Sequence, residues 1–126
     1  SLDEFACDVE QFERAVINLV ENAIKFTPSG GKVVLRARQE NNAMVFVIED
    51  TGVGIEQQLQ ARVFDRFYRA HQKGVEHVTG SGLGLSLVKA VVENHHGKVW
   101  LESTPGVGTT FYVSIPVYQI KQEWYE

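Results

Sequence analysis

Hydrophobic residues recur every three or four positions between residues 9 and 26, which predicts an amphipathic helix. The residues on this face are Phe12, Ala15, Val16, Leu19, Val20, Ala23 and Ile24. Asp8 is a candidate N-cap in front of the helix, and Pro28 and Gly30 follow its end. A second helix is predicted to begin at Gly82 or Gly84 and to stop at Gly97. Its inner side carries Leu85, Val88, Val91, Val92 and His95.

Four segments have the composition of strands, at 32–38, 43–48, 98–103 and 110–116. Residues 43–48 are almost all apolar, which is typical of a central strand, and residues 40–42 form a turn signal before them. A short helix is predicted at 56–62 and a mobile loop at 70–81. The pattern predicts an α+β two-layer sandwich with a mixed, mostly antiparallel sheet of four or five strands and helices on one face.

The composition is that of one folded domain. The chain has 126 residues, of which 44% are hydrophobic and 22% charged, and a net charge of −4 argues against a nucleic-acid-coating role. Cys7 is the only cysteine, which excludes an intramolecular disulfide framework. No apolar run reaches the roughly 20 residues that span a bilayer. Because the only methionine is Met44, we expect a piece of a larger protein.

Three polar residues share a stripe of the first helix outside its apolar face. Asn18 and Asn22 are four residues apart and Lys25 is three further on, so all three project from one side. Asparagine is a mediocre helix former, which suggests a use beyond folding. An amide oxygen is a suitable Mg²⁺ ligand and an ammonium group binds phosphate. The alternative is a solvated polar face.

Asp50 ends the second predicted strand and precedes Gly52 and Gly54. Its carboxylate could accept a hydrogen bond from an amino group such as that of adenine, and the glycines would let the backbone approach a flat ring. The alternative is a type I turn with aspartate at its first position.

A second glycine-rich segment, Gly80-Ser81-Gly82-Leu83-Gly84-Leu85, stands where the predicted loop meets the second helix. Free amides at a helix start attract anions, and glycine leaves room for a phosphate. The spacing matches neither the dinucleotide-binding fingerprint nor the Walker loop. Arg69, beside two phenylalanines, could clamp a phosphate or simply be solvated.

Taken in order, these segments resemble the ATP-binding catalytic domain of sensor histidine kinases, within the GHKL (Bergerat) ATPase superfamily. Residues 18–28 resemble the N box, 50–55 the first glycine box and 63–69 the F box. Residues 80–85 and 106–110 resemble the second and third glycine boxes. The resemblance covers about residues 8–116 of a single domain at 1–126 and leaves a tail at 117–126.

The resemblance implies roles for individual residues. Asn22 would hold Mg²⁺ with support from Asn18, while Lys25 and Arg69 would bind phosphate. Asp50 would accept from the adenine amino group, with Phe26 against the ring. The remaining nucleotide contacts would come from Gly52, Gly54, Gly80, Gly82, Leu83, Gly84 and Thr109. Residues 70–81 would form a lid.

The implied activity is transfer of the γ-phosphoryl group of Mg-ATP to a histidine on a separate dimerisation and phosphoacceptor domain. None of His71, His77, His95 and His96 is followed by an acidic residue, as the acceptor would be, so the chain is expected to be the donor half only. A response regulator would act downstream. We expect the fragment to be monomeric and cytoplasmic, and its parent to be a homodimer.

Two other functions stay open. An ATP-hydrolysing clamp of the same superfamily would have a glutamate in place of Asn18 to polarise water, which an amide cannot do. A non-catalytic nucleotide-sensing or interaction module would keep the fold without the transfer. One departure from the family is His95-His96-Gly97 where His-Gly-Gly is common, and His96 in a left-handed turn would lower stability slightly.

Overall fold

The computed structural model describes residues 8–65 and 84–116. The helices are α1 (Val9–Lys25), α2 (Gln57–Gln60) and α3 (Gly84–Asn94). The strands are β1 (Val33–Glu40), β2 (Ala43–Asp50), β3 (Lys98–Thr104) and β4 (Gly108–Pro116). Predictions for the loop at 70–81 and the tail at 117–126 lie outside the described residues. In the described part, no helix is both long and apolar enough to cross a membrane.

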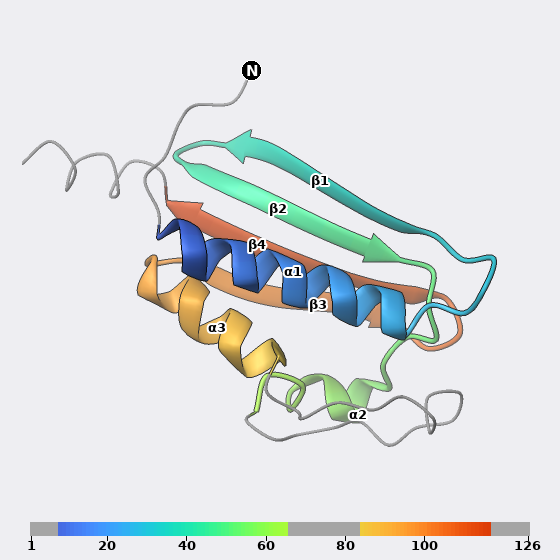
Figure 1. Ribbon diagram of the computed structural model, residues 1–126. Helices are drawn as coiled ribbons and strands as arrows, with labels where there is room; N and C mark the ends of the chain where they lie inside the picture. The colour runs from blue at the N-terminus through green and yellow to red at the C-terminus, as the bar shows by residue number, and fades with distance from the viewer. Residues whose placement is uncertain (1–7, 66–83, 117–126) are drawn as a thin grey trace, which may run out of the picture.

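The four described strands form one sheet in the order β1-β2-β4-β3, and each neighbouring pair is antiparallel. Helices α1 and α3 lie side by side across one face of this sheet (Figure 1). The predicted α+β two-layer sandwich is therefore confirmed, and the described part of its sheet is antiparallel throughout. Strand β2 is central, as its apolar sequence predicts, with Val47 and Ile48 buried on opposite faces.

The core lies between the helices and the sheet. Its largest fully buried side chains are Phe111, Leu19, Ile48, Ile115, Val88 and Val92. Strand β4 alternates buried and half-buried residues along its length, the period-two pattern of a strand with one face on a core. Helix α1 buries Ala15, Leu19 and Ala23, which are among the residues that its hydrophobic periodicity identifies.

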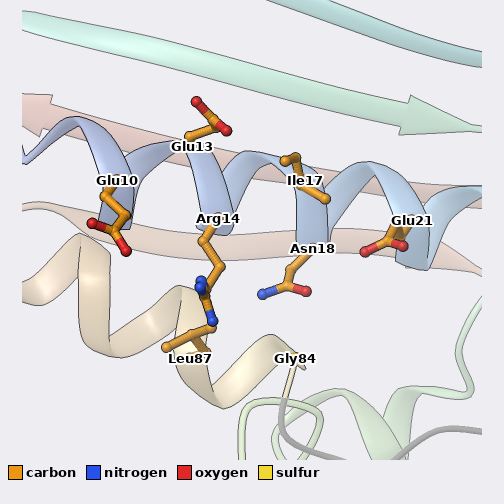
Figure 2. Close-up of a pocket in the computed structure, with 8 residues that line it drawn as sticks. All are labelled: Glu10, Glu13, Arg14, Ile17, Asn18, Glu21, Gly84 and Leu87. Carbon is orange, nitrogen blue, oxygen red and sulfur yellow. The ribbon is translucent and has the colours of Figure 1, made fainter.

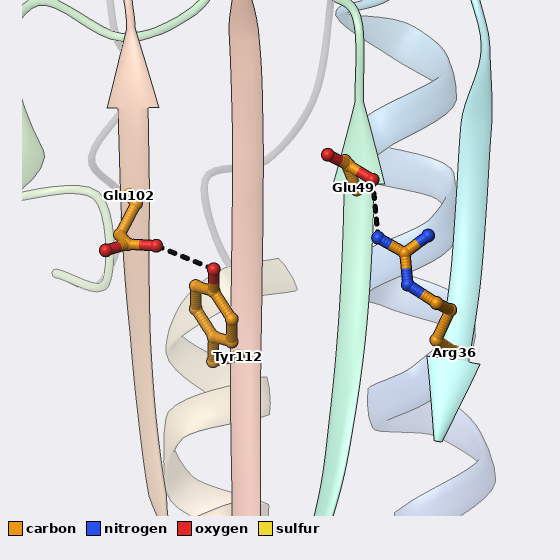
Figure 3. A network of polar contacts seen from close by, with 4 residues as sticks. All are labelled: Arg36, Glu49, Glu102 and Tyr112. Atoms are coloured by element: carbon orange, nitrogen blue, oxygen red, sulfur yellow. Dashed lines mark hydrogen bonds and ion pairs between the residues drawn. The ribbon is translucent and has the colours of Figure 1, made fainter. Parts of the chain in front are cut away.

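The sheet's other face carries polar and aromatic pairs. Arg36 of β1 and Glu49 of β2 form an ion pair with 2.7 Å between nitrogen and oxygen, and Tyr112 donates a hydrogen bond to Glu102 at 2.6 Å (Figure 3). Trp100 stacks on Tyr112 with ring centroids 5.2 Å apart. Arg36, Glu49, Glu102 and Tyr112 lie on the side of the strands away from the helices, and the first three are exposed there.

The ends of both long helices are fixed by local contacts. The Asp8 carboxylate accepts a hydrogen bond from the Gln11 amide at 3.0 Å, which confirms the predicted N-cap of α1. At the end of α3, the amide of Gly97 donates to the Val92 carbonyl and that of His96 to Glu93, the pattern of a Schellman motif. His96 therefore adopts a φ of 61°, the left-handed conformation that its place in the sequence suggests.

Candidate nucleotide-binding site

Asp50 is the last residue of the central strand β2, where it pairs with Thr109 near the start of β4. Its side chain is 6% exposed, and Oδ1 accepts the Gly52 amide at 2.8 Å and the Thr109 amide at 3.2 Å. No hydrogen bond to the other oxygen, Oδ2, is found in the described part of the chain. Backbone amides thus hold one carboxylate oxygen in place, while the second keeps its capacity to accept a hydrogen bond.

Burial raises the pKa of Asp50 above its ordinary value, because a dehydrated carboxylate is disfavoured. The hydrogen bonds from the Gly52 and Thr109 amides oppose this shift, and the neighbouring charge of Glu49 adds slightly to it. A buried, partly desolvated acceptor of this kind strengthens a hydrogen bond to a ligand amino group, since little water competes for it.

The loop after Asp50 is held between α1 and the β3–β4 turn. The Val53 amide donates to the Phe26 carbonyl at 3.1 Å, and the Val53 carbonyl accepts from Gly106 at 2.8 Å. A Cβ atom at Gly52 would lie 2.3 Å from the Phe26 carbonyl oxygen, and one at Gly54 2.3 Å from that of Thr104. Gly54 also has a φ of 75°. Both glycines are therefore required by the protein's own backbone; their contact with a base stays a prediction.

Sequence reasoning missed two residues that shape this loop. The Ser103 hydroxyl accepts the Ile55 amide at 2.8 Å and contacts the Thr109 hydroxyl at 2.7 Å. The Gln60 amide group donates to the carbonyls of Ile55 and Ser103. Ser103 comes from β3, far from Asp50 in sequence, whereas Gln60 ends α2, which follows the loop after Asp50. Only the hydroxyl and amide chemistry of serine and glutamine hinted at such a use.

The polar stripe of α1 follows from its helical geometry. Asn18 and Asn22 are half-buried and Lys25, in the last turn, is exposed. A Cβ atom at Gly84, the first residue of α3, would lie 3.9 Å from the Asn18 side-chain oxygen, so the stripe faces the start of α3. From Asn18 to Phe26 the helix rises about 12 Å at 1.5 Å per residue.

Few side chains in the described part of the chain could ligate a magnesium ion. Among residues 8–65 and 84–116, no group of three histidine, cysteine or acidic side chains is arranged to hold a metal. The Asn22 amide is half-exposed and makes no side-chain hydrogen bond within that part of the chain, so it is available as a single neutral oxygen ligand. Mg²⁺ commonly takes one or two protein ligands and completes its shell with phosphates and water, so Asn22 fits a nucleotide-bound Mg²⁺.

An open groove of about 450 Å³ runs between α1 and α3 at the Asn18 end of the stripe. Figure 2 shows Arg14 and Asn18 extending from α1 towards Leu87 and Gly84 of α3. Of the predicted site residues, the groove includes Asn18 and Gly84 and excludes Asp50. Asp50, Gly52, Gly54 and Thr109 instead gather at the end of α1 near Phe26.

Four predicted site residues lie outside the described part of the chain. They are Arg69, Gly80, Gly82 and Leu83. Their roles, and that of the expected lid at 70–81, stay predictions.

The sequence matches a known protein family and is similar to several known proteins. The profile of the family "Histidine kinase-, DNA gyrase B-, and HSP90-like ATPase" matches residues 7–119. The circadian input-output histidine kinase CikA of Thermosynechococcus vestitus is 42% identical over 114 residues, 90% of this chain and 16% of that protein. The sensor histidine kinase TmoS of Ectopseudomonas mendocina is 42% identical over 112 residues, 87% of this chain and 11% of its own length.

Solved structures of histidine kinases have a similar fold. The mycobacterial sensor histidine kinase MprB superposes with a TM-score of 0.80 at 35% identity, covering 89% of this chain and 76% of that one. Full-length ShkA in complex with AMPPNP gives a TM-score of 0.79 at 28% identity, covering 91% of this chain and 23% of ShkA. The chain thus spans between about a tenth and a quarter of full-length relatives such as TmoS and ShkA. It belongs to the histidine kinase-, DNA gyrase B- and HSP90-like ATPase family, and within it matches the catalytic domains of sensor histidine kinases.

Proposed function

We propose that this domain binds Mg-ATP and donates its γ-phosphoryl group to a histidine on a separate dimerisation and phosphoacceptor domain of a two-component sensor kinase. The observation that carries the proposal is Asp50, a buried carboxylate with Oδ1 fixed by two backbone amides and with no hydrogen bond to Oδ2 in the described part of the chain. That arrangement suits the exocyclic amino group of adenine, a hydrogen-bond donor. The solved ShkA relative, which is bound to an ATP analogue, supports the nucleotide assignment.

In this proposal the nucleotide lies along α1. The adenine binds at Asp50, Gly54 and Phe26, with Gly52 and Thr109 holding the carboxylate in place. The phosphates extend along the polar stripe towards Gly84 and meet Lys25. Arg69, Gly80, Gly82 and Leu83 would complete the phosphate contacts from outside the described residues. Mg²⁺, held by Asn22 with support from Asn18, would neutralise charge on the phosphate oxygens.

The transfer itself needs little covalent chemistry from this domain. A neutral imidazole nitrogen of the acceptor attacks the γ-phosphorus; a nitrogen–phosphorus bond forms, the bond to the bridging oxygen breaks and ADP leaves. The domain's contribution is to position the triphosphate and to stabilise the charge that shifts onto the leaving oxygen. Lys25 and the backbone amides at the start of α3 are suited to that task.

His95 is a poor acceptor in this chain, because both of its ring nitrogens are engaged. Nδ1 lies 2.8 Å from the Val91 carbonyl oxygen, Nε2 accepts the Asp8 amide at 3.0 Å, and the residue is 8% exposed. This supports a donor role for the domain, with the acceptor elsewhere in the parent kinase. The proposal also places the domain in the cytoplasm of a dimeric parent that passes the phosphoryl group to a response regulator.

Three measurements test the proposal. Calorimetry should detect binding of Mg-ATP that ADP competes for; no heat and no competition would favour a non-catalytic interaction module instead. Incubation with γ-labelled ATP should leave the isolated domain unlabelled, and label on it would contradict the donor-only assignment. Steady release of phosphate by the isolated domain would favour the ATPase clamp, although Asn18 lacks the carboxylate which that reaction needs.

A further inference from the structure

The face of the sheet opposite α1 and α3, here called the outer face, has an apolar and aromatic centre. In the strand register, Trp100 of β3, Tyr112 of β4 and Val47 of β2 form one row across this face. Trp100 is 41% exposed and stacks on Tyr112 with 5.2 Å between ring centroids. Val45 and Val47, two residues apart on the same face, are each 4% exposed. Stacked aromatic rings beside aliphatic side chains are typical of the centre of an interface with another polypeptide.

Polar groups surround this centre. The charged residues of the outer face that already have a partner are Arg36, Arg38, Glu40, Glu49 and Glu102 (Figure 3). Lys98, two residues before Trp100 on β3, is exposed and forms no ion pair within the described residues. An apolar centre with a polar rim is the usual composition of a protein interface. The rim leaves the ammonium group of Lys98 to pair with an acidic side chain of the occupant.

The segment that follows β4 has a matching sequence. Residues 117–126 lie outside the described residues and follow directly after Pro116. Val117, Ile120 and Trp124 recur at the three- and four-residue spacing of an amphipathic helix. One lysine and two glutamates give the segment a net charge of −1, opposite in sign to Lys98. The family profile ends at residue 119, so most of this segment lies beyond the fold that the family shares.

The length of the segment suits the position of the aromatic pair. Tyr112 lies four residues before Pro116, or about 13 Å back along the strand at about 3.3 Å per residue. Trp124 lies eight residues after Pro116, or about 12 Å along a helix at about 1.5 Å per residue. A helix that turns back over the sheet after Pro116 therefore carries Trp124 to the row that holds Trp100. The covalent link also keeps the segment at a high effective concentration near this face.

We propose that residues 117–126 fold back as an amphipathic helix across the outer face of the sheet. Trp124 packs against Trp100, and Glu123, at the edge of the apolar stripe, pairs with Lys98. The docked segment covers the aromatic centre and directs the chain that follows it to the side of the domain away from α1 and α3. This contact lies on the opposite side of the sheet from the proposed nucleotide site, so it does not depend on the proposed function.

Tryptophan fluorescence of the 126-residue chain tests the docking, because Trp100 and Trp124 are its only tryptophans. Trp100→Phe keeps an aromatic ring on the sheet and leaves Trp124 as the only tryptophan. We expect Trp124 in this variant to emit at shorter wavelength than in the urea-unfolded chain. Its acrylamide quenching constant should be several-fold lower than in urea, because the docked ring is shielded from the quencher.

A matched pair of variants locates the contact. Trp124→Phe and Trp124→Ser both leave Trp100 as the only tryptophan, but only the phenylalanine retains an aromatic ring for docking. We expect Trp100 to be quenched more strongly, and to emit at longer wavelength, in the serine variant. Both substitutions lie outside the described fold, so the far-ultraviolet circular dichroism of the two variants should be the same.

The charge contribution is tested in the Trp100→Phe background. Lys98→Glu should raise the quenching constant of Trp124, because an attractive charge becomes repulsive, and the difference should shrink at high salt. Lys32→Glu is the matched control, since Lys32 is an exposed lysine just before β1 at the opposite end of the sheet. It makes the same charge change and should leave the quenching of Trp124 unaltered.

Three outcomes overturn the inference. Equal quenching of Trp124 in the folded and the unfolded chain means that the segment does not dock. Protection of Trp124 with identical Trp100 emission in the phenylalanine and serine variants means that the segment packs elsewhere. Protection that disappears on dilution means that the face is covered by the segment of a second copy. Failure of the domain to bind Mg-ATP would refute the proposed function and would leave this docking unaffected.

Discussion

Asp50→Asn separates the carboxylate's role in binding from its role in the fold. The substitution keeps the size of the side chain and an oxygen that can still accept from Gly52 and Thr109. The nitrogen must then occupy the place of Oδ2, since turning it towards the two backbone amides would leave donors facing donors. The amide nitrogen therefore faces the ligand, where an acceptor is needed.

The expected magnitudes follow from this geometry. Losing a hydrogen bond to a charged acceptor costs about 1.5–3 kcal/mol, which corresponds to about 10- to 100-fold weaker binding of adenine nucleotides. The fold should change by less than about 1 kcal/mol, or a few degrees in melting temperature, because both backbone amides keep their acceptor and a neutral amide is easier to bury than a carboxylate.

The sign of the pH dependence also follows. Because burial raises the pKa of Asp50 in the folded state, the folded protein holds this proton more tightly than the unfolded chain. The contribution of Asp50 to stability is therefore present below its unfolded pKa of about 3.9 and is lost as the pH rises through the raised folded pKa. The asparagine variant lacks this loss, so its stability relative to the unmodified domain should increase from pH 4 to pH 7.

Calorimetry with Mg-ADP and chemical unfolding at several pH values measure these quantities. Glu49→Gln is a matched control: it removes the adjacent carboxylate, which lies on the opposite face of the sheet in an ion pair with Arg36. Nucleotide affinity should survive in this control. If Asp50→Asn lowered the melting temperature in proportion to the affinity, Asp50 would be a turn residue and the assignment of the adenine site would be wrong.

Three further changes test other parts of the site and fold. His96→Gly should stabilise the domain by about 0.5–1 kcal/mol, because glycine accommodates a φ of 61° without a Cβ clash; an unchanged or lower midpoint of chemical unfolding would contradict this. Gly54→Ala should lower the unfolding free energy by more than about 1 kcal/mol, since its Cβ would lie 2.3 Å from the Thr104 oxygen at a φ of 75°. Thermal melting measures this loss. Gly30→Ala is the control for backbone strain alone, because Gly30 has a φ of 89° but no atom within 4 Å of its Cβ. Asn22→Ala should weaken ATP binding in Mg²⁺ but not in EDTA, and equal weakening in both buffers would remove Asn22 from the metal site.

Local patterns in the sequence decided most of the secondary structure. The three- and four-residue spacing defined α1, and the aspartate before it capped the helix as expected, because capping depends on side chains a few residues apart. The apolar run at 43–48 identified the central strand, since only a strand covered on both faces tolerates it. The order of the glycine and asparagine segments identified the family. The strand limits differed by a few residues, because pairing with neighbours extends β1 to Glu40 and starts β4 at Gly108.

The tertiary structure determined the contacts between residues that are distant in sequence. The sequence placed Asp50 at a strand end, but only the pairing of β2 with β4 brings the Thr109 amide, 59 residues later, onto its carboxylate. From the sequence, Gly52 and Gly54 were predicted to let a ligand approach the backbone. The structure shows that the packing of their loop on Phe26 and Thr104 already excludes a Cβ atom at both positions. Glu10, Glu13 and Glu21 of α1 line a groove only because α3 lies beside α1. Capping and periodicity act over a few residues and are written in the local sequence, whereas burial and long-range hydrogen bonds depend on which segments meet in space.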